Sequence, residues 1–336
     1  MSSKTTIFYT GATGYLGGAM LQLLLGDPNV TITALVRNKD KADKLEKFGV
    51  KVIVGSLDDL ALLEAEGAKA DVVIQSAAYD AIEAVKALLK GAKTRFDKTG
   101  KQPVFIHTSG TGAFAKLEAM GQYSSERVLS DADSDLFNSK AALPHNVVND
   151  ALIAADGEGY VRSYIIYPST IYGVLKGPLI DAGISHAYSV QITMAVKLSI
   201  QRGQGGMVGK GLNKWPAAHI DDTAALYKLV FDRALADTAP HGAQGTYAVE
   251  NGEYTLIDAA KRYTAVLHSV GKSANAEPEA FSAQEHENIP YLFFLGTDIR
   301  IKADRARQLG WKPAHGIQEF YESVQEDTVA VLAGKD

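Results

Sequence analysis

The chain has 336 residues, of which 46% are hydrophobic and 22% charged, as in ordinary globular proteins, so global disorder is excluded. A formal net charge of −5 argues against a nucleic-acid partner, and the absence of cysteine excludes disulfides, thiolate metal sites and cysteine nucleophiles. No run approaches the ~20 apolar residues of a membrane span and the first residues lack signal-peptide features, so we expect a cytoplasmic protein with no membrane partner.

Short apolar runs alternate with helical patterns through the first third of the chain. The predicted strands lie at residues 5–10, 30–36, 50–54, 71–75 and 104–108. The predicted helices between them lie at residues 15–25, 39–48, 58–66 and 82–93. Strands that alternate with helices favour an α/β fold built on a doubly wound, parallel Rossmann sheet.

The pattern loosens beyond residue 109. Residues 110–144 are predicted to form a long connection, followed by a strand at 160–167 and helices at 145–155, 187–201, 221–236, 256–270 and 317–332. We predict a dinucleotide-binding Rossmann domain at residues 1–172, with sheet returns near 207–250. A smaller lobe, residues 173–206 and 250–336, is predicted to cover the substrate at the nicotinamide end.

Three glycines at three-residue spacing follow the first predicted strand. Gly11 would allow a tight turn, Gly14 would let backbone amides approach a pyrophosphate, and Gly17 would let the next helix pack closely. The helix N-terminus would then face the phosphates with free N–H groups. This context predicts a dinucleotide site rather than a plain glycine-rich turn. The loop residues expected to touch the cofactor also include Thr13, Tyr15 and Leu16.

The glycine segment, TGATGYLG, resembles the motif of the extended or atypical branch of the short-chain dehydrogenase/reductase superfamily, which includes proteins of the NAD-dependent epimerase/dehydratase type. Residues 75–78 stand where the family has a turn after its fourth strand, and residues 167–173 resemble its Arg-Pro-x-x-x-Tyr-Gly segment. Residues 219–222 and the "RQLGWKP" of residues 307–313 resemble two later signatures. These motifs span residues 6–313, and the resemblance implies the Rossmann fold and a nicotinamide cofactor.

The end of the second predicted strand bears on the choice of cofactor. An acidic residue there would bind the adenine-ribose hydroxyls, whereas an arginine would pair with a 2′-phosphate. This strand ends in Val36 and Arg37 without an acid, and Lys41 and Lys44 follow. We therefore expect NADP (NADPH) rather than NAD, the alternative being a solvated basic face.

The resemblance also implies cofactor contacts at the ends of later strands. These expected contacts are Ser56, Leu57, Ser76, Ala77, Ala78, Thr108, Tyr167, Pro168, Ser169 and Thr170.

The family's catalytic Tyr-x-x-x-Lys motif is absent from residues 109–166. Its tyrosine and lysine positions fall most naturally on Ala142 and Asn146, and the position of its catalytic serine holds Gly110. Loss of a tuned proton donor should cost a ketone reductase ~10²–10⁴-fold in rate, so another residue supplies the proton or the reaction differs. The candidate catalytic residues are Ser109, Thr111 and His145.

Other side chains have a structural alternative to a role at the site. Tyr79, Tyr123 and Tyr172 could each lie near the nicotinamide, whereas His107 and His219 are better read as structural. No cluster of ligands has metal spacing, so no metal site is predicted.

We carry three hypotheses for function. The first is an NADPH-dependent oxidoreductase that reduces a carbonyl, imine or activated alkene of a small apolar molecule with a non-standard proton donor. The second is an NADP-binding sensor without turnover, and the third is a non-redox isomerase, lyase or cyclase that retains the dinucleotide. Segments 86–93 and 150–155 could form the face of a homodimer.

Overall fold

The computed structural model describes residues 4–136, 140 and 143–335. Its central sheet has seven strands in the order β11-β7-β5-β4-β1-β2-β3, and every neighbouring pair is parallel. The strands are β1 (Thr5–Thr10), β2 (Val30–Val36), β3 (Lys51–Val54), β4 (Val72–Gln75), β5 (Val104–Thr108), β7 (Arg162–Pro168) and β11 (Thr246–Val249). Apolar runs such as that of β4, buried at every position, suit a sheet covered on both faces.

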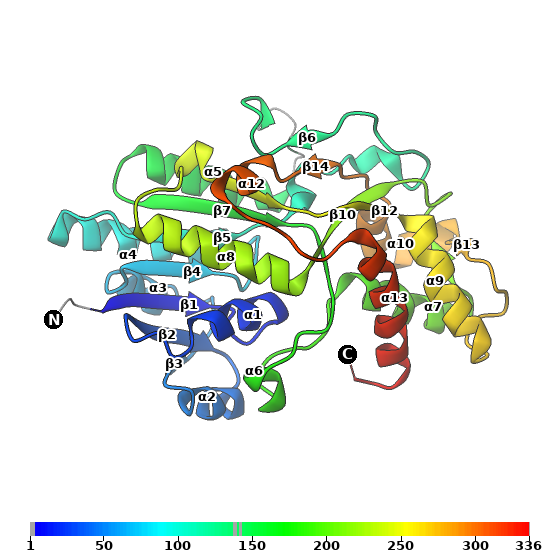
Figure 1. Ribbon diagram of the computed structural model, residues 1–336, viewed down its shortest axis with the longest axis horizontal. Coiled ribbons are helices and arrows are strands. Elements are labelled where there is room, and N and C mark those ends of the chain that lie inside the picture. The colour runs from blue at the N-terminus through cyan, green and yellow to red at the C-terminus, as the bar shows by residue number, and fades with distance from the viewer. Residues whose placement is uncertain (1–3, 137–139, 141–142, 336) are drawn as a thin grey trace.

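Helices cover both faces of the sheet, as Figure 1 shows. Helix α1 packs against α8, whereas α4 packs against α3 and α5. These helices and α2 are α1 (Tyr15–Leu24), α2 (Lys39–Glu46), α3 (Leu60–Gly67), α4 (Ile82–Thr99), α5 (Pro144–Gly157) and α8 (Ile220–Leu235). The strand order reverses between β1 and β4, where doubly wound sheets bind ligands at the carboxyl ends of their strands. The predicted Rossmann fold is confirmed.

A smaller lobe lies beyond one end of the sheet (Figure 1), with α13 packed on α7 and α9. Its strands are β8 (Thr170–Tyr172), β9 (Gly206–Met207), β10 (Lys214–His219), β12 (Glu253–Thr255) and β13 (Glu279–Ala280). Its helices are α7 (Gln191–Arg202), α9 (Leu256–Ser269), α10 (Ala283–Asn288), α11 (Tyr291–Leu295) and α13 (Ile317–Leu332). The remaining elements are β6 (Leu129–Ser130), α6 (Pro178–Asp181), β14 (Ile301–Lys302), α12 (Asp304–Leu309) and short 3₁₀ turns at Thr111–Phe114, Leu117–Ala119 and Gly242–Gln244.

Asp222 ties the start of α8 to the segment before α13. Its carboxylate accepts hydrogen bonds from the backbone N–H groups of Ala314 and His315, both at 2.9 Å. The indole N–H of Trp311 donates to the backbone carbonyl of Asp222 at 2.8 Å. Two of the motifs that carry the family resemblance therefore hold each other in place.

Residues 173–190 form an excursion that differs from the predicted lobe. Figure 1 shows α6, in the middle of this segment, beside α1 and α2 at the far edge of the sheet from α5. The Gln22 side chain of α1 donates to the carbonyl of Lys176 at 3.0 Å and accepts from the N–H of Leu179 at 3.1 Å. Part of the segment predicted to cover the nicotinamide end thus lies against the Rossmann helices.

Most predicted elements match the observed ones to within two residues, with two informative exceptions. Helix α4 continues to Thr99 and ends there, because its C-cap residue, Gly100, adopts the left-handed conformation (φ 67°). The helix expected from residue 187 begins at Gln191, because the carbonyl of Ala187 accepts a hydrogen bond from the N–H of Leu175 instead. No helix in the described part of the chain is long and apolar enough to cross a membrane.

Candidate functional site: a dinucleotide cleft

The glycine loop is built so that only glycine fits at two of its positions. Gly11 has φ +87°, and a Cβ there would lie 2.6 Å from the carbonyl carbon of Ser76. A Cβ at Gly17 would overlap the carbonyl oxygen of Gly11. The loop is therefore packed tightly on itself and on the turn after β4, while Gly14 at the start of α1 faces two cavities. This start of α1 forms a cradle that suits the phosphates of a dinucleotide.

Two cavities meet at this loop and form one cleft. A cavity of about 430 Å³ runs from the loop over the ends of β2 and β3, and one of about 610 Å³ runs toward β8 and α11. Both are lined by Gly14 and Ser76. The cleft thus follows the carboxyl ends of the strands across the switch point, as a dinucleotide with a substrate beside it requires.

The smaller cavity gathers the residues predicted for the adenosine half. Arg37 lines it and makes no ion pair with any described residue. Lys44 lies outside the wall and pairs with Asp40 at 2.9 Å on the same helix. The other predicted residues that line this cavity are Gly11, Thr13, Gly14, Ser56, Leu57, Ser76, Ala77 and Ala78.

The larger cavity gathers Tyr15, Leu16, Gly17, His145 and Ser169 from the predicted residues. Aromatic side chains from distant segments complete it. Those side chains are Tyr79, one of three tyrosines that the sequence offered as possible neighbours of the nicotinamide, and Tyr291 and Phe294 of α11, of which Tyr291 was not singled out from the sequence.

Strand β8 turns alternate side chains toward and away from this cavity. Ser169 and Ile171 line the cavity. The Thr170 hydroxyl points the other way, 3.0 Å from the hydroxyl of Tyr254, and the Tyr172 hydroxyl donates to the carbonyl of Gly316 at 2.8 Å. Because successive side chains of a strand alternate, Thr170 and Tyr172 support the lobe instead.

Three further predicted cofactor contacts have their side chains outside the cavity walls: Thr108, Tyr167 and Pro168. The Thr108 hydroxyl accepts from the Tyr227 hydroxyl at 2.9 Å, and the Tyr167 ring is buried 5.1 Å from that of Phe114. These side chains belong to the core, so a cofactor contact here would come from the main chain.

His145, in the first turn of α5, occupies the region where the family has its catalytic serine. Its ring stacks on Tyr79 with centroids 3.9 Å apart, and a Cβ at Gly110 would lie 3.3 Å from its Nε2. Glycine at position 110 thus makes room for the imidazole. Burial lowers the pKa of His145 to about 4, so the ring is neutral near pH 7. Its buried Nδ1 has no hydrogen-bond partner among the described residues.

Behind this histidine, a buried pair fixes the turn that carries Tyr79. The Gln75 amide donates to the carbonyl of Ala78 at 2.7 Å, so its oxygen accepts from Nδ1 of His107 at 2.6 Å. His107 is fully buried, as expected for a structural histidine. The pair holds the turn after β4, which lines both cavities.

Acid is expected to destabilise the protein through its buried histidines. Burial lowers the pKa of His107 to about 3 in the folded protein. Below the ordinary histidine pKa of about 6.5, the unfolded chain therefore binds a proton at this residue and the folded chain does not. Through this histidine alone, the free energy of unfolding should decrease by about 2 kcal/mol when the pH is lowered from about 7.5 to about 5. Urea unfolding at both values should show a smaller loss for His107→Leu than for wild type, whereas an equal loss would contradict the assignment.

Ser109 and Thr111, the other two catalytic candidates, line neither cavity. Both are buried, and their hydroxyls have no hydrogen-bond partner among the described residues. The backbone N–H of Ser109 donates to the carbonyl of Ile166 at 2.9 Å, which joins β5 to β7. Tyr123 lies elsewhere and donates to Glu118 at 3.2 Å. Ala142, the position aligned with the family's tyrosine, lies outside the described residues.

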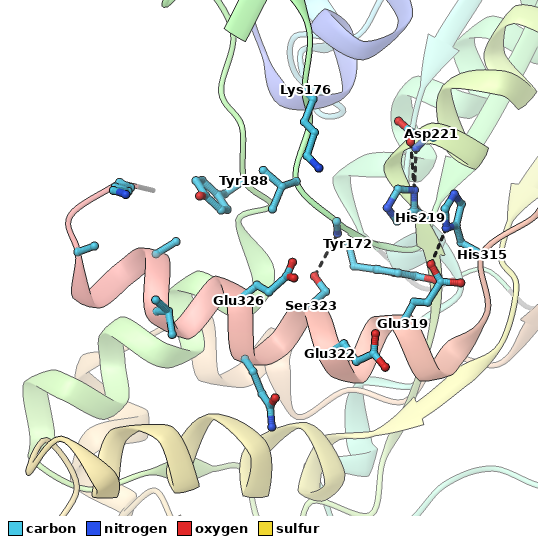
Figure 2. A pocket seen from close by; sticks show the side chains of 17 residues that line it. Tyr172, Lys176, Tyr188, His219, Asp221, His315, Glu319, Glu322, Ser323 and Glu326 are labelled. Atoms are coloured by element: carbon cyan, nitrogen blue, oxygen red, sulfur yellow. Dashed lines mark hydrogen bonds and ion pairs between the residues drawn. The ribbon is translucent and has the colours of Figure 1, made fainter. Parts of the chain in front are cut away.

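A third cavity, of about 960 Å³, lies on the Tyr172 side of β8 and is shown in Figure 2. His219, Asp221 and His315 bring potential ligand atoms within 4.8 Å of one another there, a grouping that sequence spacing did not reveal. Their hydrogen bonds account for the arrangement: Nδ1 of His219 accepts from the N–H of Asp221 at 3.2 Å, and His315 bonds Glu319 at 2.6 Å (Figure 2). The two imidazole rings stack at 3.8 Å instead of converging on one point, so we assign them a structural role.

Comparison with known proteins bears on the class of this cleft. Residues 3–95 match the model of the NmrA-like family. A relative named Oxidase ucsJ, from Acremonium sp, is 29% identical over 91% of this chain and 92% of its own. The probable pinoresinol-lariciresinol reductase 3 of Arabidopsis thaliana is 26% identical over 53% of this chain and 54% of its own.

The fold has solved counterparts. The dTDP-glucose 4,6-dehydratase of Bacillus anthracis, in complex with NAD, superimposes with a TM-score of 0.62 at 17% identity, covering 98% of this chain and 97% of that one. The family match over residues 3–95 and the shared fold agree with the resemblance that the sequence motifs indicate. The chain thus shares its fold with a dehydratase solved in complex with NAD, and its sequence is similar to those of proteins named oxidase and reductase.

Proposed function

We propose that the protein is a cytoplasmic, NADPH-dependent oxidoreductase that reduces a carbonyl, imine or activated alkene of a small apolar molecule. One observation carries the proposal: a single cleft has a phosphate cradle at its centre, the unpaired Arg37 at one end and the neutral His145 at the other. Bound NADPH would supply a hydride to the substrate carbon. Gly11, Gly14 and Gly17 would hold its pyrophosphate and Arg37 its 2′-phosphate.

The substrate end of the cleft favours an uncharged molecule. Leu16, Ile171, Val190 and Phe294 line the larger cavity, and no Lys, Arg, Asp or Glu is among its described lining residues. A charged substrate would lose its hydration there without gaining a counter-charge, which is costly. An aromatic or aliphatic molecule instead gains apolar contacts with these side chains.

His145 would orient and polarise the reacting group. A neutral imidazole cannot act as a strong acid, but its N–H can hydrogen-bond a carbonyl oxygen or imine nitrogen as negative charge develops. Reduction places one hydride on carbon and one proton on the neighbouring atom. The proton would come from water at the mouth of the cleft, while the N–H of His145 hydrogen-bonds the atom on which negative charge develops.

The test is NADPH oxidation with a panel of apolar aldehydes, ketones, imines and enones, after NADPH binding has been shown by fluorescence titration. Turnover of any class would support the proposal. Binding without turnover would favour a sensor of NADP state, and a rearranged product without net oxidation would favour an isomerase, lyase or cyclase. Failure to bind NADPH would remove the basis of the proposal.

Arg37→Ala is expected to weaken NADPH binding by about 10- to 100-fold while leaving NADH binding unchanged. A charge-assisted, bidentate contact with phosphate is worth roughly 1.5–3 kcal/mol, and NADH lacks that phosphate. Lys39→Ala is the matched control, because Lys39 is an exposed cation of the next helix that pairs with Asp43 and lies outside the cavity. An equal loss for both cofactors would show that Arg37 acts on something other than the 2′-phosphate.

A further inference from the structure

We propose that residues 183–187 form a strap over the adenosine end of the cleft, and that His186 on this strap is a second recognition group for the 2′-phosphate of NADPH. The inference rests on the proposed cofactor. The inference adds to the proposed function by giving part of the selectivity for NADPH to residues 183–187. This segment was predicted from the sequence to belong to the substrate lobe and not to the Rossmann domain.

The strap is fixed to the first Rossmann helix by close packing. A Cβ at Gly18 of α1 would overlap the side-chain oxygen of Ser185, so only glycine lets the strap approach this near. The carbonyl of Leu179 accepts hydrogen bonds from the N–H groups of Ile184 at 2.8 Å and Ser185 at 3.2 Å. His186 therefore follows a residue held against the same helix that begins at the phosphate cradle.

The next residue is held as well. The carbonyl of Ala187 accepts a hydrogen bond from the N–H of Leu175 at 2.9 Å, which closes the excursion on itself. His186 is thus bracketed by two anchored neighbours while its own side chain has no hydrogen-bond partner among the described residues. It lines the adenosine cavity together with Arg37. The neighbouring residues thus fix the backbone position of His186, while its ring nitrogens remain available to hydrogen-bond a ligand.

Positive charge gathers around His186 from separate elements. Lys41 of α2 is near enough to lower the pKa of His186, after the larger effect of burial. The Nζ of Lys44, also in α2, lies 3.9 Å from where a Cβ of Gly183 would be and is paired with Asp40 of the same helix. Arg37, which has no such partner among the described residues, faces the cavity from the end of β2. The one carboxylate that shares the cavity wall, that of Asp58, hydrogen-bonds Ser56 at 3.1 Å on the β3 side.

A phosphate dianion is the ligand that this arrangement suits. A phosphate at this end of the cleft would be attracted to Arg37 and Lys41 and would give the side chain of His186 a hydrogen-bond partner. Binding would also favour the protonated imidazole of His186, which adds a charge-assisted hydrogen bond to the pair that Arg37 makes. A nucleotide without the 2′-phosphate offers no such group.

The experiment compares dissociation constants for NADPH and NADH by fluorescence titration. His186→Ala is expected to weaken NADPH binding by about fivefold, the scale of a solvent-exposed charged contact, and to leave NADH unchanged. His186→Arg should retain NADPH affinity, because it restores a permanent cation. His286→Ala, on α10 outside both cavities of the cleft, is the matched control.

The pH dependence gives a second readout. Burial and Lys41 lower the pKa of His186 in the free protein, so protonation of its ring on the phosphate is favoured by acid. The preference for NADPH over NADH should therefore fall with rising pH more steeply in wild type than in His186→Arg. The phosphate titrates near pH 6 in both proteins, so the difference between the two profiles isolates the histidine.

The outcomes separate this inference from the proposed function. A selective loss for NADPH with rescue by His186→Arg supports the strap contact. Unchanged NADPH affinity in His186→Ala, or equal losses for both cofactors, would overturn it while leaving a measured preference of the wild-type protein for NADPH intact. If wild type binds NADH more tightly than NADPH, the proposed cofactor fails first and the strap contact fails with it.

Discussion

Gly17→Ala is expected to abolish NADPH binding and to destabilise the fold. The new methyl group would overlap the carbonyl oxygen of Gly11 and lie 2.9 Å from the hydroxyl of Ser76. Two of the three closest atoms belong to the backbone of the loop itself, so the loop must shift for α1 to stay in place. Overpacking of this kind costs about 1–3 kcal/mol, and the shift would close the phosphate cradle.

The measurements are fluorescence titration with NADPH and urea unfolding. Gly157→Ala is the matched control, because Gly157 ends helix α5 and a Cβ there meets open space. That substitution should leave NADPH binding unchanged and alter the free energy of unfolding by no more than about 1 kcal/mol. Wild-type affinity in Gly17→Ala would show that the phosphates bind elsewhere.

The glycine loop shows which part of the site could be predicted from the sequence. The loop, its strand and its helix are consecutive in the chain, so the spacing of Gly11, Gly14 and Gly17 is enough to predict their arrangement. Arg37 follows the same logic, because the end of a β2 strand in this fold always meets the adenosine end of the cleft. Most residues of the smaller cavity could therefore be predicted from short segments of the sequence.

The substrate half depends on contacts between distant segments, which no local pattern encodes. Tyr79 and His145 are separated by 66 positions and meet only because the turn after β4 faces the start of α5. Phe294 reaches the same cavity from α11. His145 was nevertheless a candidate from the sequence, because the family's Tyr-x-x-x-Lys motif is missing at this point, and the structure places it in the wall of the larger cavity.

The strap was missed for a different reason. Glycine-rich residues 173–190 were assigned to the lobe as one block, since nothing in their composition shows which side of the molecule they follow. The small residue that receives the strap, Gly18, lies in α1 beside the glycine motif, where it resembles one more glycine of the loop. Only the structure shows that Gly18 makes room for the side chain of Ser185.

His145→Ala is expected to lower kcat by about 10²–10³-fold with little change in NADPH affinity. The proposed polarisation of the reacting group depends on this ring, whereas the cradle and Arg37 lie in other parts of the cleft. His286→Ala, on the surface of α10, is the control for loss of a histidine that touches neither cavity. Wild-type kcat in His145→Ala would remove this residue from the chemistry.

The pH profile distinguishes the proposed neutral role from that of an imidazolium acid. Burial lowers the pKa of His145 to about 4, so the fraction of neutral imidazole is nearly constant near pH 7 and falls only as the pH drops toward about 4. The rate on an uncharged ketone should therefore be flat around neutrality and fall on the acid side. A rate that rises steadily as pH drops from about 8 to about 6 would mean that the protonated ring is the reactive form. That result would contradict the buried, Tyr79-stacked geometry as the catalytic state of His145.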